Sequence, residues 1–530
     1  MRIAAAWCPT WVARAAALAI VSMLGVAHAA LASPLEYLPV GDPLEAELRA
    51  LDILGPLTPG HPLRLPRTDS RPLQRFEIDS LPPAGEAFDL AHRISLERIA
   101  RVQARDAGPG AAPVPGMTPR FYQRRYADGA GLEFSVGAEG SARFAERGVH
   151  YASGTGLHTR LALETDRWLA YTHLVAGHQD SARAFADPIS QKTDIIVHTE
   201  ETYLGYSGAD GRWGVQFGRS RWHWGPGEEG SLMLSKTSAA LTGLAFHVRI
   251  EPLHADGTAL SATLKGGGGE QLAAHRLEWQ PFDRLRIGLS ESARYHSAAW
   301  QPLYLMGVVP YILVQRLQVQ DEPESTLALR NNVMVGGDVA WRVAPGTRVY
   351  AEVLADDLHL TKSITFPNKY AYQLGWEGVG TVHGTRFVWG GEYTRVTRYV
   401  YTSFYGRDFV AQGRPLGFPV APDAARMRVR IACDLSPSWQ LATVATRTRK
   451  GENTLAEAYV AVPGAPIVDA STFEGIVEET RELEGRARWW PRGGVDVAVT
   501  AGYRWVDDAG HVAGARLREA QGTLALQLVR

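Results

Sequence analysis

Hydrophobic and polar residues alternate along most of the chain after Arg120. Residues 495–505, VDVAVTAGYRW, place Val, Ala, Tyr and Trp on one face, and the charged residues of this segment fall on the other face. Residues 425–435 and 157–164 show the same period of two. This period predicts β-strands with one apolar face.

Short turn-forming segments separate many of these strands. Residues 207–211 (SGADG), 343–346 (VAPG) and 490–494 (WPRGG) have the glycine and proline content of tight hairpins. We count 18 or 19 candidate strands between Arg120 and Arg530, and we predict a barrel at residues 118–530. We predict 18 strands because bacterial single-chain barrels have even strand numbers.

The charged face distinguishes a membrane barrel from a soluble β-sandwich. Arg, Asp and Glu occupy one face at full strand length, while Val, Leu, Trp and Tyr occupy the other. Strands that contact lipid must have every backbone group paired, so the sheet must close on itself. The predicted fold class is therefore an all-β membrane barrel of about 18 antiparallel transmembrane strands.

Before the barrel, the hydrophobic period is helical. Asp42 and Pro43 precede leucines at helical spacing, and Gly55 follows them. Further helical patterns cover residues 69–81 and 86–106, and a Pro-rich linker covers residues 108–119. We predict a small N-terminal periplasmic helical module with its linker at residues 33–117.

The first 32 residues predict export. Arg2 and Arg14 precede the apolar run 15–27, and Ala30-Leu31-Ala32 suits a signal peptidase. The alternative, a membrane anchor, is disfavoured because a spanning helix needs about 20 apolar residues. We therefore interpret residues 1–32 as a signal peptide and expect the protein in the cell outer membrane.

Composition supports this location. The chain has 54 Gly, 15 Trp and 19 Tyr, and only Cys433 remains after the leader. The formal net charge of −1 leaves no electrostatic footprint for nucleic acid.

Motifs for cofactor chemistry are weak. Gly225, Gly227 and Gly230 have dinucleotide-binding spacing, but Pro226 offers no N–H and the flanks lack the required strand and helix. His residues have no metal-binding spacing, and Ser207 is one residue short of a hydrolase elbow. We expect no cofactor, no metal and no enzymatic activity.

Two groups of residues are candidates for ligand binding. Arg221, Trp222 and Trp224 offer flat apolar faces and a charged fork, although they equally suit an inward loop packed against the barrel wall. Six arginines suit either an inward row that binds anions or an ordinary solvated wall: Arg395, Arg426, Arg428, Arg430, Arg447 and Arg449.

Four acids and one apolar stretch remain open to several interpretations. Glu352, Asp356, Asp357 and Glu392 could pair with arginines, bind a cation or form a glycosidase pair.

The long apolar stretch at residues 304–319 has two interpretations. It could form a loop or short helix that lies against the barrel and closes its mouth, or it could form an ordinary strand pair.

The order of several motifs resembles the capsule-assembly Wzi family. They are PLQRFE at 72–77, WGPG at 224–227 followed by GSLMLS at 230–235, YAE at 350–352 before Asp356-Asp357, EYTRV at 392–396 followed by YVYT at 399–402, GRPLG at 413–417 and APDA at 421–424. Ala421 stands where the family usually has Gly, and Phe418 where it usually has His.

This resemblance covers essentially the whole mature chain. It implies an 18-stranded outer-membrane barrel with a periplasmic helical bundle, acting as a lectin that holds capsular or other extracellular polysaccharide at the cell surface without catalysis. For an outer-membrane barrel we also expect outer-membrane lipid and the outer-membrane assembly machinery as partners.

The function hypothesis is therefore a non-enzymatic lectin. The candidate polysaccharide-binding residues are Arg221, Trp222, Trp224, Asp356, Asp357, Glu392, Arg395, Tyr399 and Tyr401. The alternative is an outer-membrane diffusion or export porin, which shares the barrel but needs an open lumen. A surface glycosidase using Glu392 or Asp356 is a third hypothesis.

Overall fold

A computed structural model gives the structure of the chain. It describes residues 35–40, 42–56, 69–79, 81–82, 85, 89–106, 122–125, 130–145, 152–179, 196–208, 211–265, 269–321, 330–357, 366–462, 466–490 and 495–529. The predicted signal peptide and the predicted linker at 108–119 lie outside the described residues.

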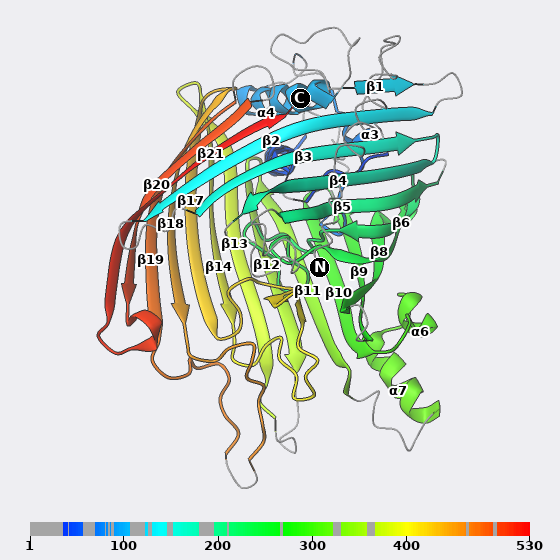
Figure 1. The fold of residues 1–530 in the computed structure, drawn as a ribbon, viewed down its shortest axis with the longest axis vertical. Coiled ribbons are helices and arrows are strands. Elements are labelled where there is room, and N and C mark those ends of the chain that lie inside the picture. The colour runs from blue at the N-terminus through cyan, green and yellow to red at the C-terminus, as the bar shows by residue number, and fades with distance from the viewer. Residues whose placement is uncertain are drawn as a thin grey trace, which may run out of the picture.

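The described residues form a closed antiparallel β-barrel (Figure 1). One sheet contains 19 strands. β1 is a short strand paired with the start of β2, and the pairing of β2 with β21 closes a ring of the other 18. The prediction of an 18-stranded barrel is confirmed.

The strand bounds are β1 (Tyr122–Arg125), β2 (Gly131–Ala145), β3 (Ala152–Glu164), β4 (Trp168–Gln179), β5 (Ile196–Ser207), β6 (Trp213–Ser220), β7 (Leu241–Ile250), β8 (Ala255–Lys265), β9 (Glu270–Phe282), β10 (Leu285–His296), β11 (Asn332–Ala344), β12 (Thr347–Asp357), β13 (Lys369–Val382), β14 (Thr385–Val396), β17 (Ala424–Ser436), β18 (Trp439–Lys450), β19 (Glu478–Trp489), β20 (Val495–Asp507) and β21 (Arg516–Val529). A separate small hairpin pairs β15 (Val410–Ala411) with β16 (Arg414–Pro415).

The alternation of the sequence sorts the two faces of the wall. On β17, Met427, Ile431 and Leu435 are exposed on the outside, whereas Asp434 is buried on the inside. Exposed tryptophans on the outer surface gather next to the short turns, as expected for an aromatic girdle: Trp168, Trp279, Trp341, Trp376, Trp439 and Trp489.

The connections differ between the two ends of the barrel. At one end, strands join through tight turns such as 345–346, 383–384 and 437–438. Long connections lie at the other end, including 297–331, 397–423 and 451–477. We call these the short-turn end and the long-loop end.

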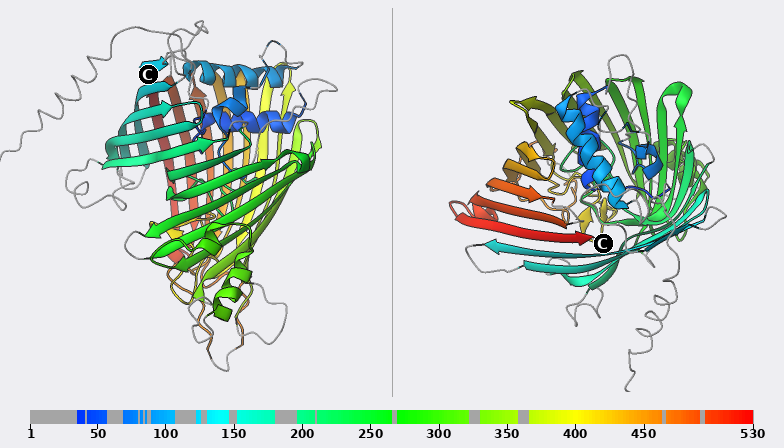
Figure 2. Two further views of the ribbon diagram at one scale, coloured as in Figure 1. Left: turned by 90° about the vertical axis from the view of Figure 1, so that its right-hand side faces the viewer. Right: turned by 90° about the horizontal axis from the view of Figure 1, so that it is seen from above.

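Three N-terminal helices lie at the short-turn end, and the blue helices in Figure 2 cross its opening. They are α2 (Pro43–Leu54), α3 (Arg75–Asp79) and α4 (Leu90–Asp106). The Asp42 side chain caps α2, and Gly55 ends it with a φ of 95°. Leu44, Leu48 and Leu51 pack with leucine and isoleucine residues of α3 and α4. Among the described helices, none is both long and apolar enough to cross a membrane.

The apolar stretch 304–319 is helical, so the strand-pair interpretation was wrong. It forms α6 (Pro302–Leu305) and α7 (Tyr311–Asp321), and single 3-10 turns occur at Glu251–Leu253 and Ala509–His511. Tyr304 and Tyr311 pack against outward residues of β9 and β10, including Tyr295. Helices α6 and α7 therefore cover the outer wall (Figure 2, left). They do not close the barrel mouth, because their buried side chains contact the outward residues of β9 and β10.

Candidate functional site

Buried ion pairs attach the helical module to the inner wall at the short-turn end. Arg386 on β14 bonds to Glu47 of α2 and to Asp434 of β17, each at 2.9 Å. Arg98 of α4 also reaches Asp434 at 2.8 Å, and all of these side chains are buried or nearly so. Since unpaired charges are expensive to bury, these partners hold the helices in one position.

The same arrangement recurs around the rest of this opening. Arg348 of β12 contacts Asp52 at 2.8 Å, and Arg286 of β10 contacts Asp69 at 2.9 Å. Arg49 of α2 reaches Glu377 of β13 at 2.7 Å. Acids and arginines of the module thus meet opposite charges from several strands.

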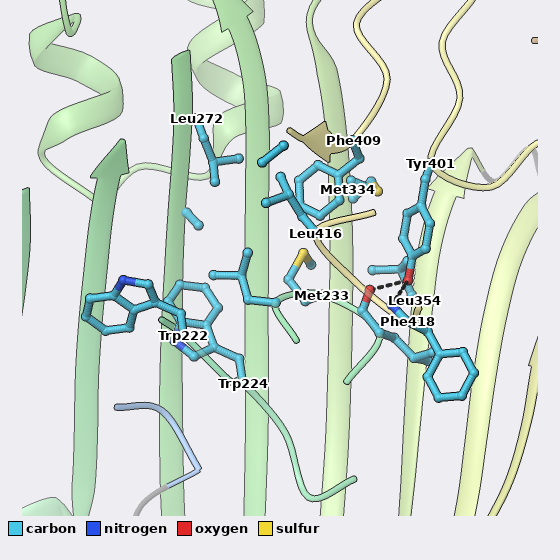
Figure 3. Packing of buried hydrophobic residues seen from close by; sticks show 14 of the residues in the cluster. Trp222, Trp224, Met233, Leu272, Met334, Leu354, Tyr401, Phe409, Leu416 and Phe418 are labelled. Atoms are coloured by element: carbon cyan, nitrogen blue, oxygen red, sulfur yellow. Dashed lines mark hydrogen bonds between the residues drawn. The ribbon is translucent and has the colours of Figure 1, made fainter. Parts of the chain in front are cut away.

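Two connections fold into the barrel and fill it with an apolar core (Figure 3). Segment 221–240, between β6 and β7, packs against segment 397–423, between β14 and β17. Trp224 and Tyr401 have no exposed surface and Phe418 has almost none. The Tyr401 hydroxyl donates to the Leu232 carbonyl at 2.5 Å and accepts from the Phe418 N–H at 3.1 Å.

The candidate residues of the WGPG segment belong to this core. Trp222 and Trp224 are buried, and Arg221 donates to the Ser238 carbonyl at 2.8 Å. The Gly225 N–H donates to the Asp69 carbonyl at 3.0 Å, which joins the core to the helical module. These placements match the interpretation as an inward loop packed against the wall.

The candidate acids hold the inserted segments by hydrogen bonds to their backbone. Glu352 accepts from the Leu232 N–H at 2.8 Å, and Glu392 accepts from the Glu228 N–H at 2.8 Å. Asp356 accepts from the Tyr401 N–H at 2.7 Å. Each carboxylate is therefore directed at the chain itself. The fourth acid, Asp357, is half exposed and contacts Lys369 at 2.7 Å.

The inward arginine row also has partners within the barrel. Arg426 contacts Glu229 at 2.9 Å, and Arg430 contacts Glu228 at 3.3 Å. Burial by itself would raise the pKa of Glu228, but Arg430 and Arg428 outweigh burial and hold this pKa at about 2. The acids that neutralise the row come from segment 221–240, so the row anchors that segment.

Three arginines assigned to this inward row face outward instead. Arg447 pairs across the sheet with the exposed Met427, and Arg449 pairs with Ala425. Arg395 lies opposite Tyr372, on the same face as the exposed Leu374. The prediction of an inward position was wrong because arginines were grouped by charge, whereas strand register decides the face.

Arg395 and Tyr399 instead contact aromatic residues at the long-loop end. The Arg395 guanidinium lies 4.0 Å from the Phe473 ring centre, and Arg449 lies 4.8 Å from the same ring. Tyr399 packs edge-on against Tyr459 at 5.5 Å. We call this set, completed by Phe366 at 6.0 Å from Tyr459, the rim cluster.

A second aromatic group lies on segment 397–423. Phe404 and Tyr405 are 56% and 54% exposed, and their ring centres lie 5.3 Å apart. Arg330 lies 5.5 Å from the Tyr405 ring. We call Phe404 and Tyr405 the aromatic tip. Sequence reasoning missed the tip and most of the rim cluster, although aromatics within long connections between strands were an available signal.

A resident metal centre has no support within the described residues, where no group of three His, Cys, Asp or Glu is arranged to hold an ion. At the long-loop end, the aromatic tip and Arg330 lie outside the packed core and are exposed.

Comparisons with known proteins agree with this architecture. The family model for capsule assembly protein Wzi matches residues 131–516. The structure of Wzi from Escherichia coli, described as a carbohydrate-binding β-barrel and an outer-membrane protein involved in group 1 capsule assembly, superposes with a TM-score of 0.61 at 13% identity, covering 95% of this chain and 99% of that one.

Weaker similarity extends to Pseudomonas aeruginosa barrels. OccD3 (OpdP) has a TM-score of 0.45 at 10% identity, covering 79% of this chain and 95% of its own, and OprD has 0.42 at 9%, covering 77% and 97%. No curated protein sequence matches the chain. Because the family model spans most of its residues, this chain belongs to the capsule assembly protein Wzi family.

Proposed function

We propose that this chain is a non-enzymatic lectin of the outer membrane, which binds capsular or other extracellular polysaccharide and holds it at the cell surface. The observation that carries the proposal is the contrast between a filled lumen and exposed aromatics at the long-loop end. Family membership and the name of the E. coli relative support the same activity.

The long-loop end has the chemistry that sugars require. The faces of Tyr and Phe rings provide apolar surfaces against which a pyranose ring can pack. Arginine adds a planar fork that matches carboxylates of acidic sugars. The aromatic tip places these groups together, since Arg330 lies over the exposed Tyr405.

The orientation follows from the connections. Bacterial membrane barrels have short periplasmic turns and longer extracellular loops. The helical module, at residues 33–117, would accordingly face the periplasm, and the aromatic tip and rim cluster would face outward. Binding of a polymer at the outer end then anchors it to the cell.

A binding experiment tests this proposal. Phe404→Ala/Tyr405→Ala should weaken binding of polysaccharide purified from the producing strain at least about tenfold, because truncating exposed aromatic anchors removes the main contact energy. The matched control is Trp168→Ala, an aromatic residue 49% exposed at the opposite end. Equal binding by the two variants and the parent would contradict the proposal.

The porin alternative predicts a different measurement. A barrel whose interior holds the packed core of Trp224, Leu232 and Phe418 should give no steady conductance in a planar bilayer. A stable, ion-selective current from the parent protein would favour the pore. Release of new reducing ends from the polysaccharide, lost in Glu392→Gln, would favour the glycosidase.

A further inference from the structure

An outward row of three arginines and one tryptophan crosses four neighbouring strands close to the long-loop end. The cross-strand register places Arg447 of β18 opposite Arg481 of β19, Arg481 opposite Trp505 of β20, and Trp505 opposite Arg518 of β21. Residues directly opposite in antiparallel strands share one face. We call these four residues the outer arginine row; strands β18 to β21 stand side by side in Figure 1.

The row faces away from the lumen. Arg447 lies directly opposite the exposed Met427 in the neighbouring strand. On β21, Arg518 is an even number of residues from the exposed Leu524, Leu526 and Leu528, so it lies on the same face of the strand. The side chains of Arg447 and Arg481 are 55% and 56% exposed. These cations therefore lie on the surface that the rest of the barrel presents to lipid.

Distance along the strands places the row at the outer edge of the membrane. Trp439 and Trp489 pair in the short-turn girdle, and Arg447 and Arg481 lie eight residues beyond them. With a rise of about 3.3 Å per residue and a tilt of about 40°, eight residues span about 20 Å of an apolar band about 25 Å tall. Trp505, whose ring lies 4.7 Å from Tyr503, provides the aromatic belt at this edge.

The local charge is positive. The next row outward contains four residues that lie opposite one another in the same way: Arg449, Glu479, Asp507 and Arg516. The two rows together contain five arginines and two acids. Glu479 contacts both Arg447 at 2.7 Å and Arg481 at 2.6 Å, and Arg516 lies 3.8 Å from Asp507. Arg518 forms no ion pair with any residue that the structure describes.

We propose that the outer arginine row binds the phosphate groups of lipid headgroups in the outer leaflet. Guanidinium groups match phosphate in a bidentate geometry, and their apolar stems can lie along the barrel while the charged ends reach the headgroup layer. Anionic headgroups attract clustered arginines at this level of a membrane. The site is separate from the aromatic tip, so its lipid ligand does not depend on the proposed polysaccharide.

Two matched double variants test the site in the full chain. Arg481→Gln/Arg518→Gln removes two outward charges while leaving Arg447 for Glu479 and Arg516 for Asp507. Arg486→Gln/Arg504→Gln removes two charges from the inward faces of β19 and β20, within the same group of four strands, where Val506 is buried. Heat-modifiable gel mobility checks that both variants fold.

Native mass spectrometry in detergent then measures retention of bisphosphorylated lipid A and of the same lipid after its phosphates are removed. The parent and the inward variant should hold the phosphorylated lipid several-fold more than the dephosphorylated one, and the outward variant should lose this preference. Added salt should weaken the preference because the charges are exposed.

Three results would overturn the proposal. The outward variant could keep the parent's preference, or removal of phosphate could leave retention unchanged. Inorganic phosphate at equal concentration could displace the lipid completely, which would identify a site for the free ion. Polysaccharide binding measured on the same variants separates the two proposals: a loss there with unchanged lipid retention would assign the row to the glycan.

Discussion

The two ends of the barrel are closed by different chemistry. At the short-turn end, side chains of α2 and α4 form buried ion pairs with the inner wall, and Arg386 and Asp434 are each about 1% exposed. At the long-loop end, the inserted segments bury an apolar core on one side and expose Phe404 and Tyr405 on the other. The first end is built to remain shut, and the second presents a surface.

Substitutions at the two ends should therefore have different effects on the free energy of unfolding. Breaking a buried ion pair leaves a charge without water or partner and costs several kcal/mol. An exposed ion pair contributes little to the free energy of unfolding. Breaking it also costs little, because water replaces the missing partner. This difference predicts where substitutions change stability and where they change only binding.

The largest effect is expected from Arg386→Met. This change leaves Glu47 and Asp434 to share Arg98, so we expect the free energy of unfolding in detergent to fall by about 3–5 kcal/mol. Urea titration followed by tryptophan fluorescence measures the change. The control is Arg516→Gln, at a side chain 70% exposed, for which less than about 1 kcal/mol is expected. Similar losses for both variants would remove the distinction between the two ends.

The next prediction, of similar expected size, concerns the core between the ends. Trp224→Ala should cost about 3–5 kcal/mol, because the Trp224 ring is fully buried and its loss leaves a cavity. The matched variant is Trp341→Ala, whose side chain is 52% exposed on the outer wall and leaves no cavity inside. If Trp341→Ala were the more damaging change, the stability attributed to the interior core would be wrong.

The smallest expected effect is a pH dependence of segment 221–240. Removal from water, with Lys236 nearby, lowers the pKa of His223 to about 3. Between its ordinary pKa of about 6.5 and this value, the unfolded chain binds a proton that the folded chain does not. Stability from this group is therefore full above about pH 6.5 and declines as the pH falls toward 3.

The hydrogen bonds of the neutral His223 imidazole are consistent with its lowered pKa. In the folded chain His223 Nε2 lies 3.0 Å from the Gly227 carbonyl, and Nδ1 accepts from the Lys236 N–H at 3.4 Å. A proton on Nδ1 would abolish that acceptor. The thermal midpoint should fall from pH 7.5 to pH 5.5 in the parent and fall less in His223→Gln. An equal fall in both proteins would assign the pH dependence to other groups.

Several features of the site could be predicted from local pattern. Asp42, Pro43 and Gly55 determine where α2 begins and ends, because caps act within one helical turn. Trp222 and Trp224 could not be placed, because aromatic residues suit a ligand surface and a packed core equally well. Their position became clear only where segment 221–240 meets Leu416 and Phe418 of a distant connection.

For most strands the sequence by itself separated an apolar outward face from a polar inward face, since successive side chains alternate and lipid favours apolar side chains. The outward positions of Arg395, Arg447 and Arg449 were not recognised, because their charge suggested the lumen. The sequence also determined the barrel class and the position of the N-terminal helices. Only the tertiary structure decided which acid meets which arginine, that two connections fill the lumen, and that Arg447, Arg481 and Arg518 form one row. Those relations depend on strand register and on contacts between distant segments, which no local pattern records.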